Sequence, residues 1–251
     1  MFHQIVFITT LYLLLGLFEC LFPVERKQPT RERFRNLALT GIFFVVGSTA
    51  TLLLLQPLTV TPTTIAHPLF LSILIIFLGV FLTDVIFYLY HRAQHTIPAL
   101  WAIHELHHSD ANMNATTSLR THWLEHTIQA AIIGFPVSLV IQGNSIEMFF
   151  VGMIITLWLF FTHANWRLSL GRATSILTGP QLHRIHHSRL PQHQDKNFAQ
   201  IFPILDHVFG TYYAPAQDEF PPTGTVGLPT NVSIQRAFLH PFLVWLRKSK
   251  S

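Results

Sequence analysis

Long apolar segments constrain this chain more than any other feature of its sequence. Crossing the roughly 30 Å hydrocarbon core of a bilayer takes about 20 helical residues, and residues 2–22, 36–58 and 68–90 are each long and apolar enough. Only 11% of the residues are charged, against roughly 25% in an ordinary soluble domain. A water-soluble globule could not cover its surface with so few charges, so the sequence predicts an integral membrane helical bundle.

Two shorter apolar segments, 127–142 and 145–162, follow one another almost without a break. They predict a hairpin that either crosses the bilayer or is re-entrant, and both forms stay open at this point. The expected fold is therefore all-α, with four to five hydrophobic helices and a His-rich helical cap in the cytoplasm. We expect a single membrane domain that comprises three transmembrane helices (1–90), a first cytoplasmic segment (91–126), the hairpin (127–163) and a cytoplasmic tail (164–251).

The basic residues predict the orientation of the chain. All 16 Lys and Arg residues lie in the loop 23–35, in the segment 91–126 or in the tail after residue 163, whereas the loops 56–67 and 142–145 have none. The positive-inside rule places the basic side in the cytoplasm. Because these residues form no stripe between aromatic side chains, the net charge of +4 indicates no nucleic-acid partner. The compact chain favours a multi-pass protein of a bacterial inner membrane.

Histidine is as common as Lys and Arg together, with 16 residues, and its distribution is uneven. Eleven histidines fall within residues 91–126 and 183–193. One H-x-x-x-H and two H-x-x-H-H patterns place imidazoles on single helix faces, since residues three and four apart lie side by side. These eight rings exceed the three or four that one tetrahedral zinc needs and suit two metal ions. The eight are His91, His95, His104, His107, His108, His183, His186 and His187.

Acidic and phenolic side chains are available to support such a site. Asp84, Tyr88, His91 and His95 share one face of the third helix. Asp84 or Tyr88 could therefore hold the ring N–H of a metal-bound histidine, as ligating histidines generally require. An ion pair between Asp84 and Arg92 is the alternative. Imidazole binds iron, zinc, copper or nickel, so the ligand type alone does not name the metal.

The three histidine patterns resemble a known family. His-Arg-Ala-Gln-His at 91–95, His-Glu-Leu-His-His at 104–108 and His-Arg-Ile-His-His at 183–187 look like the histidine boxes of the fatty acid hydroxylase/sterol desaturase superfamily. Arg-Thr-His-Trp-Leu-Glu at 120–125, His-Ala-Asn at 163–165 and Leu-Asp-His-Val-Phe-Gly-Thr at 205–211 resemble its linking motifs. The resemblance runs from about Asp84 to Tyr213.

This resemblance implies a dinuclear non-haem iron centre that activates O2 and hydroxylates or desaturates a C–H bond of a lipid. It implies the eight box histidines as ligands and His163 as a ninth, with two Fe ions as cofactor and zinc as an occupant of the purified protein. Five residues are candidates either to bind a metal or to hold a metal-bound imidazole: His122, Asp84, Tyr88, Glu125 and Asn165. His126 and His193 are expected to be non-ligands.

An alkyl C–H bond has no acidic proton, so a redox-active metal is needed to cleave it, and the protein supplies orientation and exclusion of water. We expect hydroxylation rather than desaturation. The single Cys20 excludes an iron–sulfur cluster, and no haem-binding or flavin motif is present. The electrons are therefore expected from a separate carrier, a ferredoxin or a b-type cytochrome with its reductase. The substrate is expected to be a bilayer lipid.

Two other functions fit part of the sequence. His104-Glu105-Leu106-His107-His108 also satisfies the H-E-x-x-H zinc protease pattern, in which the glutamate is the general base. An intramembrane metalloprotease would leave the remaining boxes unexplained. A non-enzymatic metal transporter would place its ligands at the bilayer midplane, where this chain carries no box.

Overall fold

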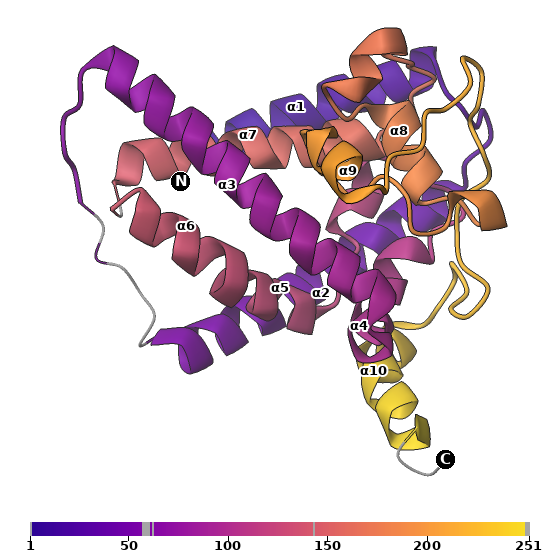
Figure 1. The fold of residues 1–251 in the computed structure, drawn as a ribbon. Helices are drawn as coiled ribbons and strands as arrows, with labels where there is room; N and C mark the ends of the chain where they lie inside the picture. The colour runs from indigo at the N-terminus through magenta and orange to yellow at the C-terminus, as the bar shows by residue number, and fades with distance from the viewer. Residues whose placement is uncertain (1, 57–60, 62, 143, 249–251) are drawn as a thin grey trace.

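The computed structural model describes residues 2–56, 61, 63–142 and 144–248 (Figure 1). Within these residues the secondary structure is helical, and extended pairing is limited to isolated bridges such as Pro23 with Trp166. The expectation of an all-α fold is confirmed.

The apolar segments form the long helices of the fold. These are α1 (Phe2–Leu21), α2 (Thr30–Leu55), α3 (Leu69–Thr96) and α7 (Ser145–His163). In the described part of the chain, α2, α3 and α7 are long and apolar enough to cross a membrane. α2 begins six residues before the expected 36–58 segment, because charged helix formers such as Glu32 and Arg35, joined by a 2.6 Å ion pair, continue the helix into water. The expected end at residue 58 lies outside the described residues.

The predicted hairpin is present as two helical legs. Its first leg is a continuous rod of α5 (Trp123–Gln129), the π-helical η3 (Ala130–Gly134) and α6 (Phe135–Val140), and α7 forms the second leg. The wide π turn lies directly before Pro136, which has no N–H and whose ring would clash with the carbonyl of residue 132 in a regular helix. The two legs and α3 share a core of Val80, Ile133, Val137, Ile141 and Val151.

Shorter elements gather at the end of the bundle where α3 and α7 terminate (Figure 1). α4 packs against both α3 and α10, and α8 packs against α7. Residues 234–248 form a closing helix, α10, and residues 215–229, which are rich in Pro and Gly, contain no helix. The elements are α4 (Pro98–His108), η2 (Ala115–Leu119), η4 (Gly171–Ser175), α8 (Pro180–His186), η5 (Pro191–His193), α9 (Ile204–Phe209) and α10 (Ile234–Lys248).

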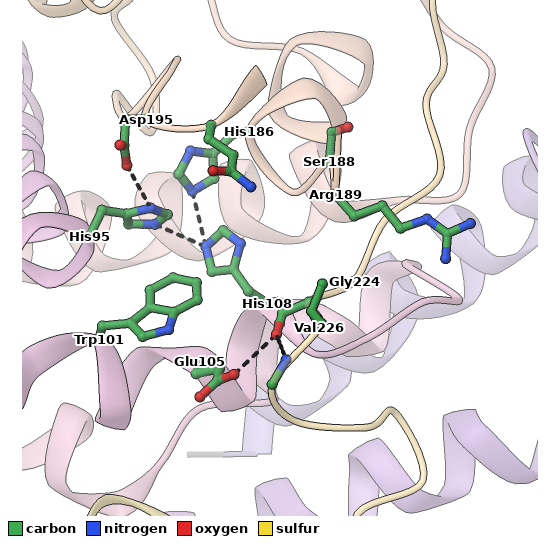
Figure 2. Close-up of a pocket in the computed structure, with 13 residues that line it drawn as sticks. His95, Trp101, Glu105, His108, His186, Ser188, Arg189, Asp195, Gly224 and Val226 are labelled. Atoms are coloured by element: carbon green, nitrogen blue, oxygen red, sulfur yellow. Dashed lines mark hydrogen bonds and ion pairs between the residues drawn. The ribbon is translucent and has the colours of Figure 1, made fainter. Parts of the chain in front are cut away.

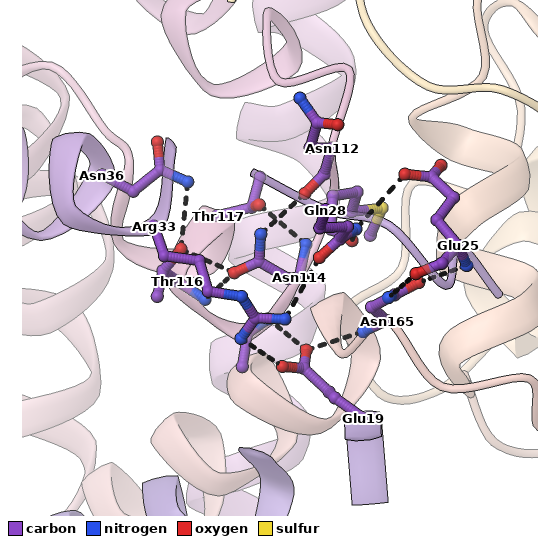
Figure 3. Close-up of polar contacts among 12 residues, drawn as sticks. Glu19, Glu25, Gln28, Arg33, Asn36, Asn112, Asn114, Thr116, Thr117 and Asn165 are labelled. Atoms are coloured by element: carbon purple, nitrogen blue, oxygen red, sulfur yellow. Dashed lines mark hydrogen bonds and ion pairs between the residues drawn. The ribbon is translucent and has the colours of Figure 1, made fainter. Parts of the chain in front are cut away.

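Buried polar contacts tie α1 and α2 to this end of the bundle (Figure 3). The Glu19 carboxylate accepts hydrogen bonds from Arg33 at 2.6 Å and from the backbone N–H groups of Ala115 and Asn165, both at 2.8 Å. One side chain of α1 thus joins α2, η2 and the segment after α7.

Arg120 is the largest fully buried side chain in the described part of the chain. Its guanidinium donates to the Leu106 carbonyl at 3.0 Å, to Asn36 Oδ1 and Ser109 Oγ at 2.8 Å, and to the Thr230 carbonyl at 2.9 Å. Burial lowers the pKa of Arg120 below its usual value, but the group stays charged at neutral pH. These bonds connect α2, α4 and the segment before α10.

Replacing Arg120 with Met removes a buried charge and the donor to four acceptors, of which only the Leu106 carbonyl keeps another hydrogen-bond partner among the described residues, the Ser109 hydroxyl at 2.8 Å. We expect a loss of roughly 3–5 kcal/mol of stability, which lowers the melting temperature by about 10 °C for a chain of this size. Thermal unfolding in detergent, followed by circular dichroism, measures the change. Arg172→Met, at an exposed position, is the control and should melt within about 2 °C of wild type. Equal melting temperatures for both variants would contradict the assigned role of Arg120.

Candidate metal centre

Nine buried or half-buried histidines form two clusters in which the ligand atoms lie within 4.8 Å of one another. The first cluster contains five rings, and the second contains four. The first consists of His91, His95, His104, His108 and His186, and the second of His107, His163, His183 and His187.

Four helix ends supply these rings. The last two turns of α3 carry the H-x-x-x-H pair, and α4 carries one H-x-x-H-H triplet. The other triplet lies on α8 and its C-cap residue His187, and the final residue of α7 is His163. Each triplet divides between the clusters, because positions three and four apart on a helix diverge by a fraction of a turn. On α4, His104 and His108 belong to the first cluster and His107 to the second. On α8, His186 belongs to the first cluster, and His183 and His187 belong to the second. The clusters adjoin where His108 and His187 stack, with 4.2 Å between ring centroids.

The Nε2 atoms of the first cluster face one another at short distances. His91 and His104 approach to 3.1 Å, and His108 lies 3.1 Å from His104. His108 also lies 3.2 Å from both His95 and His186. Two nitrogens bound to one metal ion at about 2.0–2.1 Å would be separated by roughly 3.0–3.4 Å, so this spacing is that of a shared ion.

The second cluster has the same geometry. His163 Nε2 lies 3.1 Å from His107 Nε2 and 3.0 Å from His183 Nε2, and His187 Nε2 lies 3.2 Å from His183 Nε2. Burial lowers the pKa of six rings of the two clusters well below the usual value, with further lowering by neighbouring histidines. These rings are therefore neutral and keep one lone pair each. They are His104, His107, His108, His183, His186 and His187.

Hydrogen bonds at Nδ1 set the tautomer of four rings. The bonds are His91 to the Phe198 carbonyl, His104 to Glu125 Oε1 and His186 to the Lys196 carbonyl, all at 2.9 Å, and His163 to the Leu159 carbonyl at 2.8 Å. A neutral imidazole has one N–H, so a ring that donates from Nδ1 presents a lone pair at Nε2. The facing Nε2 atoms of His91 and His104 consequently have no proton between them. A bound cation satisfies both lone pairs, and a hydrogen bond does not.

Glu125 is the carboxylate nearest to the clusters. It is 1% exposed, and besides His104 it contacts the side-chain amides of Gln94 at 2.9 Å and Gln129 at 3.3 Å. Burial raises the pKa of Glu125 to about 7. A buried carboxylate needs a counter-charge, and the hydrogen-bond partners of Glu125 among the described residues are His104, Gln94 and Gln129, with neither Lys nor Arg. A cation at Nε2 of His104, across the ring from Glu125, would supply this counter-charge. The set of side chains therefore fits a metal ion.

Asp84 and Tyr88 are close to the site but do not touch a clustered histidine. Asp84 accepts the backbone N–H groups of Gln200, Ile201 and Phe202 at 2.6–3.1 Å, and Tyr88 shares a 2.7 Å hydrogen bond with Thr211. Both thereby anchor the segment 198–211 to α3. Because this segment supplies the Phe198 carbonyl to His91, Asp84 acts on the ring through the backbone.

Asp206 has a parallel role from within that segment. Its carboxylate accepts the backbone N–H groups of Phe198 at 2.7 Å and Ala199 at 3.0 Å, and the Thr211 hydroxyl at 2.7 Å. Burial raises the pKa of Asp206 above its usual value. Backbone carbonyls such as that of Phe198 carry no signal in the sequence, so this layer of support was not predictable from residue types.

The other candidate residues lie outside the clusters. His122 Nδ1 accepts the Leu124 N–H at the start of α5, and its Nε2 donates to the Phe238 carbonyl at 3.1 Å. The Asn165 side chain bonds the backbone of Glu25. His193 is held between Ser188 and Glu219, and the half-buried His126 packs beside Phe44. Within the first cluster, Asp195 Oδ1 lies 3.6 Å from His95 Nδ1.

A polar cavity of about 470 Å³ adjoins the first cluster, between the end of α3, α4 and the loops 188–195 and 224–227 (Figure 2). His95, His108 and His186 line it together with Trp101 and Glu105. Glu105 does not point to a metal position, because its two oxygens accept hydrogen bonds from Thr225 at 3.1 Å and from His240 at 2.8 Å. These bonds hold α4 against α10 and the loop before it. The sequence offered no reason to connect His240 with Glu105.

A second cavity of about 320 Å³ lies on the opposite side of the histidines, between α3, the α5–η3 rod and α7. Its walls are mainly apolar, with Phe87 from α3, Ile133 from η3, and Ile155 and Leu159 from α7. Five clustered histidines reach its surface: His91, His104, His107, His163 and His183. The two clusters thus lie between a polar cavity and an apolar one.

Comparison with known proteins agrees with this arrangement. The fatty acid hydroxylase family model matches residues 76–211. Alkylglycerol monooxygenase from Danio rerio is 36% identical over 143 residues, which are 57% of this chain and 30% of the relative. The Homo sapiens alkylglycerol monooxygenase is 33% identical over 178 residues, covering 67% of this chain and 36% of the relative. Ornithine lipid hydroxylase OlsE from Rhizobium tropici is 27% identical over 151 residues, which are 60% of this chain and 45% of the relative.

The chain spans less than half of the length of these curated relatives. No solved structure matches it. The segment that matches the family model covers more than half of the chain and contains every histidine of the two clusters. The chain therefore belongs to the fatty acid hydroxylase family.

Proposed function

We propose that this protein is a membrane-bound lipid hydroxylase that holds two iron ions, one in each histidine cluster. The observation that carries the proposal is the convergence of nine imidazoles into two adjoining groups whose Nε2 lone pairs face one another at 3.0–3.2 Å. His91, His95, His104, His108 and His186 would hold one ion, and His107, His163, His183 and His187 the other.

The choice of iron follows from the reaction. Zinc has no redox chemistry, whereas oxidation of an unactivated C–H bond by O2 needs a metal that changes oxidation state. Imidazole is a good ligand for iron. When bound, the two ions would supply activation of O2 at the face of the apolar cavity. Zinc can occupy the same ligands in purified protein without supporting turnover.

The residues around the ions would orient them and exclude water. Glu125 holds the His104 ring, and the carbonyls of Phe198, Lys196 and Leu159 hold three others. Removing such partners typically costs 10–100-fold in metal affinity or activity. The apolar walls between α3 and α7 keep bulk water from the reacting carbon.

The relatives favour hydroxylation over desaturation, because their names describe a monooxygenase and a hydroxylase of lipids. We propose that the substrate of this protein is likewise a lipid of the bilayer. The cytoplasmic side, a separate ferredoxin or b-type cytochrome as electron donor, and a bacterial inner membrane remain part of the proposal. The hairpin is proposed to cross the bilayer with α7.

The metalloprotease alternative has less support. In that mechanism Glu105 would activate water on the zinc, but its carboxylate is occupied by His240 and Thr225. His107, inside the same H-E-x-x-H pattern at 104–108, belongs to the second cluster. A transporter is disfavoured because the ligands lie at helix ends, away from the middle of the long helices.

The two clusters should lose metal separately. His186→Ala removes a ligand of the first cluster and His107→Ala one of the second, so each variant should fall from about two metal ions per chain to about one, and neither should insert oxygen into lipid. Elemental analysis of protein purified from membranes measures the metal. His207→Ala is the control, because this exposed ring only stacks on Tyr212. Full metal content in either cluster variant would refute the assignment.

The wild-type protein should add one oxygen atom to a membrane lipid. We expect cells that express it to accumulate a lipid heavier by one oxygen, and the label to appear in that lipid when the cells grow under 18O2. Cells that express His107→Ala provide the background. Lipid mass spectrometry that shows loss of two hydrogens instead would identify a desaturase, and peptide cleavage by a protein with one zinc would support the protease.

Electron transfer should weaken with salt. Docking of an acidic carrier on a basic face depends on charges that salt screens over about 10 Å at 0.1 M ionic strength. Turnover with a reconstituted ferredoxin or cytochrome should therefore fall severalfold between about 0.05 and 0.5 M NaCl, while turnover driven by a small chemical reductant should change little. An unchanged carrier-driven rate would argue against electrostatic docking.

A further inference from the structure

The two histidine clusters differ in how their rings are oriented. In the first cluster, three of the five rings form a hydrogen bond at Nδ1. In the second cluster His163 forms such a bond, whereas Nδ1 of His107 and of His183 is buried and has no hydrogen-bond partner among the described residues. A ring that lacks this bond is directed mainly by the position of the backbone that carries it. The second cluster therefore depends more on the segments from which its rings project.

Three of the four rings of the second cluster lie on two segments of the chain. His163 is the last residue of α7, and His183 and His187 lie on α8 and its C-cap. The loop 22–29, which joins α1 to α2, contacts both segments. This loop lies outside residues 76–211, which match the family model, so the family match does not describe its effect on the metal centre.

Glu25 in this loop reaches α8 through an ion pair. Its Oε1 accepts a hydrogen bond from Nη2 of Arg184, which directly follows His183 on α8. The Arg184 side chain is 4% exposed, and its Nε donates to the Pro221 carbonyl at 2.8 Å. An arginine keeps its charge when it is buried, so it needs a counter-charge nearby. Glu25 supplies this counter-charge and thereby holds α8 against the loop.

The backbone of Glu25 holds the segment that follows α7 (Figure 3). Its N–H donates to Asn165 Oδ1 at 3.0 Å, and its carbonyl accepts from Asn165 Nδ2 at 2.9 Å. Asn165 is 2% exposed and lies two residues after His163. The Val24 N–H continues the contact by donating to the Asn165 carbonyl at 3.3 Å. One loop residue therefore holds both segments that carry the rings of the second cluster.

Taking the proposed metal centre as given, we propose that Glu25 is a positioning residue for the ion of the second cluster. Its side chain sets the position of α8 and its backbone sets the end of α7, so that three of the four rings converge on one ion. The hydrogen-bond partners of Glu25 among the described residues are Arg184, Asn165 and Gln28. Glu25 thus acts on the ion through these partners and not as a ligand.

The first cluster provides an internal comparison. α8 supplies one of its five rings, His186, and that ring also bonds the Lys196 carbonyl at 2.9 Å. The other four rings lie on α3 and α4. A shift of α8 and of the end of α7 therefore displaces three of four ligands in the second cluster but only one of five in the first.

Zinc affinity in two single-site backgrounds tests the proposal without turnover. His91→Ala, on α3, should leave only the second ion, and His107→Ala, on α4, only the first, while both leave α7 and α8 unchanged. Glu25→Gln keeps an acceptor for Arg184 but removes the counter-charge. It should raise the Kd for Zn²⁺ about 10–100-fold in the His91→Ala background. In the His107→Ala background the Kd should stay within about twofold, as expected for independent sites.

Two further variants complete the measurement, which uses full-length protein in detergent and competition with a chromophoric chelator. Asn165→Ala removes the contact with the end of α7 and leaves no buried charge, so it decides the question if the Glu25→Gln protein does not accumulate in membranes. It should weaken Zn²⁺ about tenfold or more in the His91→Ala background alone. Glu32→Gln is the control, because its 2.6 Å ion pair with Arg35 lies within α2, and it should change neither Kd.

The two backgrounds distinguish a positioning role from a purely structural one. Loss of folding would weaken Zn²⁺ equally in both backgrounds, and that result would overturn the proposal. Unchanged affinity in the His91→Ala background would overturn it as well, and if each background still binds one ion, the proposed metal centre stands. If neither background binds one ion, the proposed metal centre fails together with this inference.

Discussion

The structure depends on the burial of nine imidazole rings whose lone pairs converge. Seven Nε2 contacts of 3.0–3.2 Å join the rings into two groups, and neutral rings with lone pairs face to face repel one another unless a cation lies between them. The short helices α4 and α8, the ends of α3 and α7, and the segment 196–199 are arranged so that these rings meet. Stability of this end of the bundle and affinity for metal are therefore linked.

Carboxylates organise the surroundings of the rings at two levels. Glu125 contacts His104 directly, whereas Asp84 and Asp206 bind backbone N–H groups of the segment 198–202 and so set the carbonyl that holds His91. A buried carboxylate that accepts several N–H groups fixes a loop as firmly as a short helix would. The irregular backbone beside α3 is thereby made rigid enough to serve a metal centre.

The histidine clusters separate two environments. The polar cavity touches rings of the first cluster beside α4 and α8, and the apolar cavity touches rings of both clusters beside α3 and α7. Apolar and water-borne molecules therefore meet the histidines through different cavities. This division gives a physical reason for placing the site at the end of the membrane helices rather than in their middle.

The sequence by itself determined the all-α class, the three long apolar helices and the hairpin, because these follow from hydrophobic length and local helix signals. Spacing on helices, a local property, also identified eight of the nine clustered histidines, and the family resemblance added His163. The sequence could not show that each H-x-x-H-H triplet divides between the clusters. Nor could it show that Asp84 serves a loop instead of a ring, or that His240 reaches Glu105.

Those outcomes join residues far apart in the chain, and only the packing of α3, α4, α7 and α8 decided them. The π turn at 130–134, whose residues Ala130, Ile133 and Gly134 line the apolar cavity, likewise depends on how the rod packs around Pro136. A hydrophobic pattern depends on residues that are neighbours in the sequence. The partner of a ring and the shape of a cavity depend on contacts between helices that are far apart in the sequence.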